Sequence, residues 1–409
     1  MKNGSPKYKF DKFDENWLLV KISNIACQFK TGGTPNTKVP IFWDGTIPWI
    51  QSSDLQKDKL FGVKPQKFIS EEGLQNSSAK LIPKNSIAIV TRVGVGKLAI
   101  IDQEYATSQD FLSLSDFNGD TQFIVYSIYR MLQKESTQLQ GTSIKGITKE
   151  DLLSKKINFP EIEEQQVIGS LFRTLDDLLA SYKDNLANYQ SLKATMLSKM
   201  FPKDGQTVPE IRLDGFEGEW EVQTLKKLAS FSKGNGYTKN DLVNSGKEII
   251  LYGRLYTNYQ TVISKVNTFV TTVKANTVIS KGGEVIVPSS GESAEDISRA
   301  SVVEKSGIIL GGDLNIIYPD RNKVNSIFLA LTISNGSQQK ELIKRAQGKS
   351  VVHLRNNDLE KVVLHYPSME EQRAISSCFA NLDNLISAHK EKISQLETLK
   401  KKLLQDMFI

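Results

Sequence analysis

The sequence predicts an α+β protein in which two mixed α/β domains are each followed by a long helix, and in which one half of the chain repeats the other. Two observations predict this class. The chain has 409 residues, more than one ordinary core can hold. Residues 140–201 also align with 347–408 at a constant offset of 207, and their apolar residues recur every three or four positions.

The repeated parts form a shared frame at both ends of each half. Gln140 and Gly141 match Gln347 and Gly348, and the run 163–165 (EEQ) matches 370–372. The halves also begin alike, because 6–17 corresponds to 209–220 at an offset of 203, with a tryptophan closing each run. Between these ends, Lys30 to Gln138 and Lys233 to Arg345 show no convincing alignment. The chain is therefore interpreted as a tandem duplication with divergent middles.

The shared tails have the pattern of long amphipathic helices that begin just after Pro160 and Pro367. About 40 residues at about 1.5 Å each span roughly 60 Å, which is wider than one domain. Each helix is therefore expected to extend beyond its own domain as half of a shared rod; the alternative is that it only covers its own domain. The residues predicted to pack between the helices are Leu171, Leu175, Leu178, Tyr182, Leu186, Leu192, Leu382, Leu385, Ile393, Leu396, Leu399 and Leu403.

The divergent middles have the pattern of mixed sheet domains. Short β-branched runs at Ser86 to Val90, Val285 to Val287 and Ile308 to Leu310 predict strands, and Phe123 to Gln133 and Val324 to Ile333 predict helices. The resulting division is domain 1 at 1–160, a central helix at 161–201, domain 2 at 202–367 and a second long helix at 368–409.

Composition and motifs favour binding over catalysis. A formal net charge of +6 suits a polyanionic partner. The run Thr91 to Leu98 is the nearest to a phosphate loop, but it lacks the first glycine and ends in leucine where magnesium needs a hydroxyl. Neither the three histidines nor Cys27 and Cys378 have metal-ligand spacing. We therefore expect no catalytic residue, metal or cofactor in this chain, and, without a long apolar run, a cytoplasmic location and no membrane contact.

The pattern resembles the specificity subunits of Type I restriction-modification systems. The resemblance rests on Trp17 followed by 32–35 (GGTP), on 47–50 (IPWI), on the run from Pro209 to Trp220, and on the two helix starts. It implies two target-recognition domains held apart by an antiparallel coiled-coil spacer with pseudo-twofold symmetry. It also implies that two modification subunits and two restriction subunits do the chemistry, using S-adenosylmethionine, ATP and magnesium.

Two recognition domains held apart by paired helices predict that the protein binds double-stranded DNA at two short, different half-sites, separated by a spacer whose sequence is not recognised. A self-sufficient nuclease or methyltransferase, and a scaffold that binds only protein, are the competing hypotheses. Polar loop residues are the candidate readers, each with the alternative of a solvated loop residue or a turn former. They are Thr34, Asn36, Gln51, Ser52, Arg92, Lys97, Ser143 and Lys145 in the first half, and Asn235, Tyr237, Arg254, Tyr256, Asn258, Tyr259, Ser289, Ser290, Lys349, Ser350 and His353 in the second.

Overall fold

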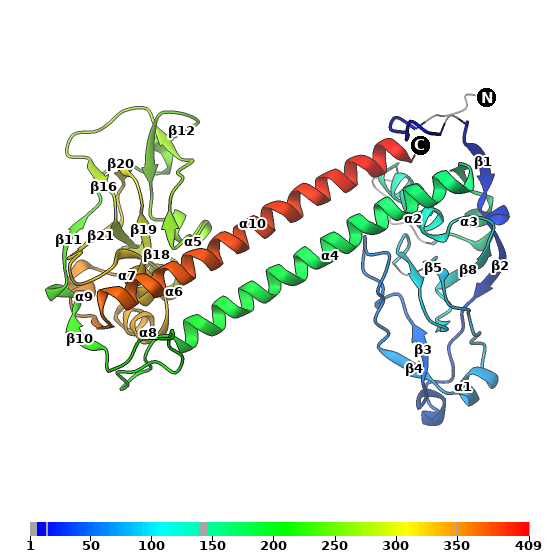
Figure 1. Ribbon diagram of the computed structural model, residues 1–409, viewed down its shortest axis with the longest axis horizontal. Helices are drawn as coiled ribbons and strands as arrows, with labels where there is room; N and C mark the ends of the chain where they lie inside the picture. Colours follow the sequence, from blue (N-terminus) through cyan, green and yellow to red (C-terminus); the bar gives the residue numbers. More distant parts are fainter. Residues whose placement is uncertain (1–5, 14, 93, 139–145, 349–350, 409) are drawn as a thin grey trace. The chain divides into compact units, whose positions relative to one another are not determined.

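The computed structural model describes residues 6–13, 15–92, 94–138, 146–348 and 351–408, and it divides into two compact units. Unit 1 holds residues 1–183 and 391–409, and unit 2 holds 184–390. Both divisions fall inside long helices, α4 (Ile162–Lys199) and α10 (Met369–Met407), which are labelled in Figure 1. The two division points are equivalent positions of the repeat, because Lys183 and Lys390 are also 207 residues apart.

Unit 1 contains two main sheets, with strand orders β2-β8-β5-β6 and β4-β3-β7, and a strand pair β1-β9. Helix α2 packs against the larger sheet, and the core between them includes Trp17, Phe123 and Phe172. The elements are β1 (Leu18–Lys21), η1 (Ile22–Asn24), β2 (Ala26–Thr31), η2 (Pro40–Trp43), β3 (Ile47–Ile50), β4 (Lys67–Ile69), α1 (Glu71–Gln75), β5 (Ser86–Val90), β6 (Leu98–Ile101), β7 (Ala106–Thr107), β8 (Phe111–Phe117), α2 (Thr121–Gln138), α3 (Lys149–Ser154) and β9 (Lys156–Phe159).

Unit 2 contains five-stranded sheets of order β11-β21-β17-β19-β14 and β12-β15-β13-β20-β16, and the pairs β10-β23 and β18-β22. Its elements are β10 (Glu221–Thr224), η3 (Leu225–Lys227), β11 (Ala229–Lys233), η4 (Lys239–Asp241), β12 (Leu242–Val243), β13 (Lys247–Ile250), α5 (Arg254–Thr257), β14 (Val262–Ile263), β15 (Phe269–Val270), β16 (Val278–Lys281), β17 (Glu284–Pro288), β18 (Ser290–Gly291), α6 (Ala294–Ile297), β19 (Ser301–Val303), β20 (Ser306–Leu310), β21 (Leu314–Pro319), α7 (Ser326–Ile333), α8 (Gly336–Arg345), β22 (Val352–His353), α9 (Asn356–Leu359) and β23 (Val363–Tyr366).

The divergent middles share a topology that their sequences do not reveal. Order β2-β8-β5-β6 in unit 1 corresponds to β11-β21-β17-β19 in unit 2, with antiparallel pairing throughout. In the second sheet of each unit, the first strand of a parallel pair (β3 with β7, β13 with β20) also has an antiparallel neighbour, β4 or β15, and in unit 2 the antiparallel strand β16 adds to the other side. The predicted strands and helices lie within β5, β17, β20, α2 and, except at its first residues, α7. The predicted mixed α/β class is confirmed.

The long helices pack antiparallel within each unit. In unit 1, Lys400 of α10 pairs with Asp176 of α4, while Lys183, further along α4, pairs with the earlier Glu397 at 2.6 Å. In unit 2, Lys193 pairs with Asp383 at 2.5 Å. The Lys193–Asp383 and Lys400–Asp176 pairs are copies of one another at the offset of 207. Such reciprocal contacts are typical of a twofold-related interface.

Burial along both helices has a heptad period. In α4 the buried and half-buried positions include 168, 172, 175, 179, 182, 186, 189, 193 and 196, in alternating steps of four and three. Positions 375, 379, 382, 386, 389, 393, 396 and 400 of α10 follow the same rhythm. An average step of 3.5 residues keeps one seam facing a partner helix along its length, as in coiled coils.

The structure corrects the predicted packing stripe at four leucines. Leu178, Leu192, Leu385 and Leu399 have exposed fractions of 42%, 47%, 40% and 45%. The reason is that Lys193 and Lys400, next to two of these leucines, take the seam positions, where each meets an aspartate. Among the other predicted residues, Leu175, Leu382 and Leu396 are buried, and Leu171, Tyr182, Leu186, Ile393 and Leu403 are half-buried.

The long helices are also too polar for a lipid bilayer. Neither α4 nor α10, nor any other helix of the described ranges, has the length and apolar character needed to cross a membrane.

Candidate nucleic-acid interface

Loops that follow three strands of unit 1 meet at one place. Gly33, after β2, donates its backbone N–H to Thr107 O at 2.9 Å, and Ser108 donates to Ile50 O, at the end of β3, at 3.0 Å. A Cβ atom at Gly33 would lie 2.3 Å from the backbone of Ser78. The glycine is therefore required by close backbone approach, and it brings Thr34 to the edge of this loop group.

The loop between β5 and β6 joins the same group. Lys97 Nζ donates to Ser52 O at 3.1 Å, and Thr91 N–H donates to Asp110 O at 2.7 Å. Ile147, the second described residue after the gap at 139–145, donates to Thr91 O at 2.8 Å. We call Thr34, Gln51, Ser52, Arg92 and Lys97 reading cluster 1, since these contacts gather their loops.

The side chains of reading cluster 1 differ in how freely they can meet a ligand. Arg92 is exposed, and no hydrogen bond or ion pair within the described ranges engages its guanidinium. Thr34 shares a hydrogen bond of 3.0 Å with Gln109, and Gln51 and Ser52 are half-buried. Asn36 is exposed, and its Oδ1 accepts from Lys38 N–H within its own loop. The predicted readers Ser143 and Lys145 lie outside the described residues.

Unit 2 builds the same backbone arrangement from different side chains. Ser289 N–H donates to Asp313 O at 2.8 Å, and Leu354 N–H donates to Ser289 O at 3.0 Å. These two bonds repeat the Thr91–Asp110 and Ile147–Thr91 bonds of unit 1 at the equivalent strand ends. Ser290 pairs with His353 in the β18-β22 pair, which places an exposed imidazole beside the serines.

Two further predicted readers lie next to this arrangement. The backbone of Gly236 accepts from Gly312 N–H at 2.8 Å, which brings neighbouring Asn235 close to the loop before β21. Tyr256, in α5, is adjacent to α6, which in turn contacts β18 and β22. We call Asn235, Tyr256, Ser289, Ser290 and His353 reading cluster 2. Asn258 is exposed at the end of α5, and Lys349 and Ser350 lie outside the described residues.

Three other predicted readers also hold the fold of unit 2, and the cluster members Ser289 and Ser290 are themselves buried, at 6% and 7% exposed. Tyr237 is 5% exposed, and its hydroxyl accepts from Lys274 N–H at 2.7 Å. Arg254 donates to Asn267 Oδ1, Gln260 Oε1 and Lys265 O at 2.8–3.0 Å, and burial lowers the pKa of its guanidinium. Burial also raises the pKa of the Tyr259 hydroxyl, which hydrogen bonds to side chains of its own unit. The hydroxyl and guanidinium groups that could recognise a base thus already hydrogen bond to neighbouring residues of unit 2.

Sequence reasoning missed a pair of acidic residues. Asp110 and Asp313 occupy equivalent places beside the two clusters, and Ser289 Oγ also reaches Asp313 Oδ1 at 3.4 Å. Both precede a buried strand at an offset of 203, which is the offset of the two N-terminal frames. Extending that offset through the middles would have found them.

The two clusters have the chemistry of base and phosphate recognition. Amide, hydroxyl, imidazole and carboxylate groups can match the donors and acceptors of base edges, while Arg92 and Lys97 can contact phosphates. Among the described residues there is no group of three or more metal-ligating side chains that could hold an ion. Two similar polar clusters on a duplicated frame have the organisation expected of a DNA-specificity protein.

Comparison with known proteins identifies the family. A family model described as "Type I restriction modification DNA specificity domain" matches residues 14–188 and again 217–398. The chain therefore belongs to the family of Type I restriction-modification DNA specificity proteins, and the predicted class, a recognition chain and not a catalytic one, is confirmed by this membership.

Individual relatives agree with this membership. The chain is 22% identical over 405 residues to the Type I restriction enzyme MjaVIII specificity subunit of Methanocaldococcus jannaschii, covering 95% of this chain and 91% of the relative. It is 24% identical over 244 residues to the MjaIX specificity subunit of the same organism, covering 56% of each. The crystal structure of the Type I restriction-modification S subunit from M. genitalium has a TM-score of 0.64 at 16% identity and covers 99% of both chains, which shows a common fold.

Proposed function

We propose that this chain directs a Type I restriction-modification complex to a bipartite, asymmetric DNA target, with unit 1 and unit 2 each reading one half-site. The main support is the backbone arrangement Thr91–Asp110–Ile147, which recurs as Ser289–Asp313–Leu354. The same scaffold presents different side chains in the two units. Two domains with the same backbone arrangement but different side chains are suited to two half-sites of different sequence.

Helices α4 and α10 act in this proposal as the spacer that sets the distance between the half-sites. Their heptad burial and reciprocal Lys–Asp pairs favour one register of the helix pair. A charged residue at a seam position penalises slipped registers, in which it would lie buried without its partner. A fixed register gives a fixed length of unread DNA.

Partner subunits supply the catalysis in this proposal. Two modification subunits would transfer methyl groups from S-adenosylmethionine, and two restriction subunits would use ATP and magnesium. The exposed leucines support paired partners, because Leu178 and Leu192 on α4 are duplicated as Leu385 and Leu399 on α10. Two equivalent apolar faces fit two copies of one protein.

The test is an exchange of one reader. Residues 30–138 are replaced by the corresponding segment of a relative with a known target, and the hybrid is expressed with modification subunits before methylome sequencing. We expect one half-site to change and the other half-site and the spacer to persist. A change in both half-sites would contradict independent readers.

A simpler measurement separates this function from that of a scaffold that binds only protein. The purified chain should bind duplex DNA of random sequence with an affinity that falls as salt rises, because several phosphate contacts release counterions. Absence of any salt-dependent DNA binding would favour the scaffold.

A further inference from the structure

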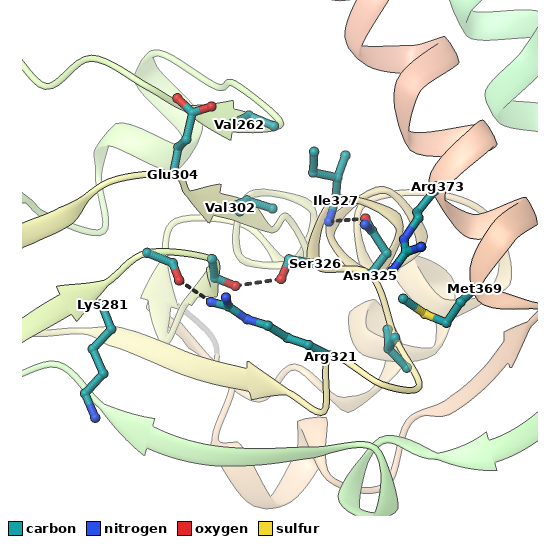
Figure 2. Close-up of a pocket in the computed structure, with 13 residues that line it drawn as sticks. Val262, Lys281, Val302, Glu304, Arg321, Asn325, Ser326, Ile327, Met369 and Arg373 are labelled. Carbon is teal, nitrogen blue, oxygen red and sulfur yellow. Dashed lines mark hydrogen bonds between the residues drawn. The ribbon is translucent and has the colours of Figure 1, made fainter.

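Unit 2 contains an open cleft of about 550 Å³ beside the first turn of α10. Its walls come from the β16–β17 turn, the loop between β21 and α7, and α10 (Figure 2). None of the candidate readers lines it. The cleft is therefore separate from reading cluster 2 and needs its own explanation.

Two arginines face the cleft from different elements. Arg321 lies on the β21–α7 loop and Arg373 on α10, whereas Lys281 and Glu304 extend away from the centre in Figure 2. Arg321 donates to Gly282 O, and a Cβ atom at Gly283 would lie 2.5 Å from its guanidinium. The glycine turn thus holds Arg321 in place, and its remaining N–H groups stay available. Among the described residues, no hydrogen bond or ion pair engages Arg373.

The floor of the cleft is apolar. Its accessible apolar surface comes from Val262, Ile327 and Met369, which are half-buried. Val302 and Val324, at 4% and 0% exposed, lie beneath this surface. A DNA phosphate has no apolar part to cover such a floor. A peptide with a carboxylate next to an aliphatic or aromatic side chain satisfies both the floor and the arginines, since guanidinium groups bind carboxylates through two parallel hydrogen bonds.

The corresponding loop in the described part of the first repeat is shorter. Asn118 and Asp320 make equivalent backbone hydrogen bonds just after β8 and β21. Asp120 and Asn325 are also equivalent, because the backbone N–H of each donates to a glutamine of the long helix. One residue lies between the two positions in unit 1, whereas four lie between them in unit 2. That longer loop carries Arg321. In unit 1 a Cβ atom at Gly119 would already lie 2.5 Å from Gln165 Oε1, so this space is closed.

Arg373 is also specific to the second repeat, because Gln166 holds the equivalent position in α4. We propose that the cleft binds an acidic segment of a partner protein, with carboxylates at Arg321 and Arg373 and an adjacent apolar side chain against Ile327 and Met369. Because both arginines belong to the second repeat alone, each chain binds one such segment. The proposal is independent of the DNA-reading function.

The experiment selects peptides from a random display library on the full chain. The parallel selection uses R321Q/R373Q, and the matched control is K340Q/K344Q, which removes the same charge from exposed lysines of α8 in the same unit. We expect the parent and the control to enrich peptides in which Asp or Glu is next to Leu, Ile, Val or Phe. A synthetic copy of the most enriched peptide should bind R321Q/R373Q at least tenfold more weakly than it binds the parent. A version of the peptide in which Asn or Gln replaces the acidic residue should likewise bind the parent at least tenfold more weakly than the acidic peptide does.

Two results would overturn the proposal. The first is enrichment of the same acidic peptides on R321Q/R373Q, or no acidic enrichment on the parent. The second is that R321Q/R373Q loses affinity for random duplex DNA, with a flatter salt dependence than K340Q/K344Q, while peptide binding is unchanged; the cleft would then bind DNA phosphates. Hydrogen exchange of unit 2 in both variants establishes that the fold is retained.

Discussion

Adding one heptad to each long helix, after Lys183 in α4 and after Lys390 in α10, should lengthen the unread spacer of the DNA target. Both points are divisions between the compact units, so the Lys193–Asp383 and Lys400–Asp176 pairs stay intact. Seven residues keep the heptad seam in phase and add about 10.5 Å. At about 3.4 Å per base pair, the spacer should grow by about three base pairs.

The assay is methylome sequencing of cells that express the variant with its modification subunits. The extra base pairs also rotate one half-site by about 100° around the DNA axis, so methylation should be slower even at the longer site. The control inserts two residues at each point, which turns the seam by about 200° and should abolish assembly. An active heptad variant with the parental spacer would show that the helices do not set the distance.

The equivalent positions of the two repeats give further predictions. Arg212 forms a bidentate pair with Glu371, whose side chain is 2% exposed, so Arg212→Met should destabilise unit 2 by about 3–5 kcal/mol, whereas Lys9→Met at the matching place should cost under about 1 kcal/mol. Burial raises the pKa of Glu164, so the folded unit binds this proton more tightly than the unfolded chain does. The stability of unit 1 therefore falls as pH rises from the ordinary glutamate pKa to the raised pKa of the folded unit. Glu164→Gln should therefore raise the melting temperature of unit 1 at neutral pH, with the gain vanishing in acid, while Glu371→Gln should lower that of unit 2. Arg92→Gln should weaken binding to all duplexes alike and reduce the salt slope by about one if Arg92 contacts a phosphate.

Hydrogen exchange resolved by segment measures the stability of each unit separately, and fluorescence anisotropy measures DNA affinity. Equal destabilisation by Arg212→Met and Lys9→Met would contradict the buried pair. A stabilising effect of Glu164→Gln that persists below the ordinary carboxyl range would mean that packing, not ionisation, causes it. A loss of affinity for only one sequence would assign Arg92 to base recognition.

Much of the frame shared by the two halves could be predicted because its sequence occurs twice in the chain. The starts of α4 and α10 follow from Pro160 and Pro367, and apolar periodicity predicts their length. The seam itself was missed at Lys193 and Lys400, because a search for apolar residues passes over a lysine that pairs with an aspartate of the facing helix. Leu192 and Leu399, one residue earlier, took their place in the prediction.

The candidate site was harder to predict because side-chain type does not reveal local partners. Arg254 and Tyr237 have suitable chemistry for DNA recognition, but hydrogen bonds to Lys265 O, 11 residues along the chain, and from Lys274 N–H, 37 residues along, occupy these groups. The common sheet order of the middles was equally hidden. Its strands are short, and their pairing depends on tertiary contacts that no local pattern records.

The cores of the two units are completed at different times during synthesis. Unit 2 is one continuous stretch, so its core, in which Phe201 packs on Phe328 and Phe379, is complete once residue 390 has been made. Unit 1 must wait, because Phe408 packs on Phe123 and Phe172 and is translated after the whole of unit 2. On the ribosome the first half therefore remains open along its α2 face until the last turns of α10 emerge, and its apolar side chains stay exposed while unit 2 is translated.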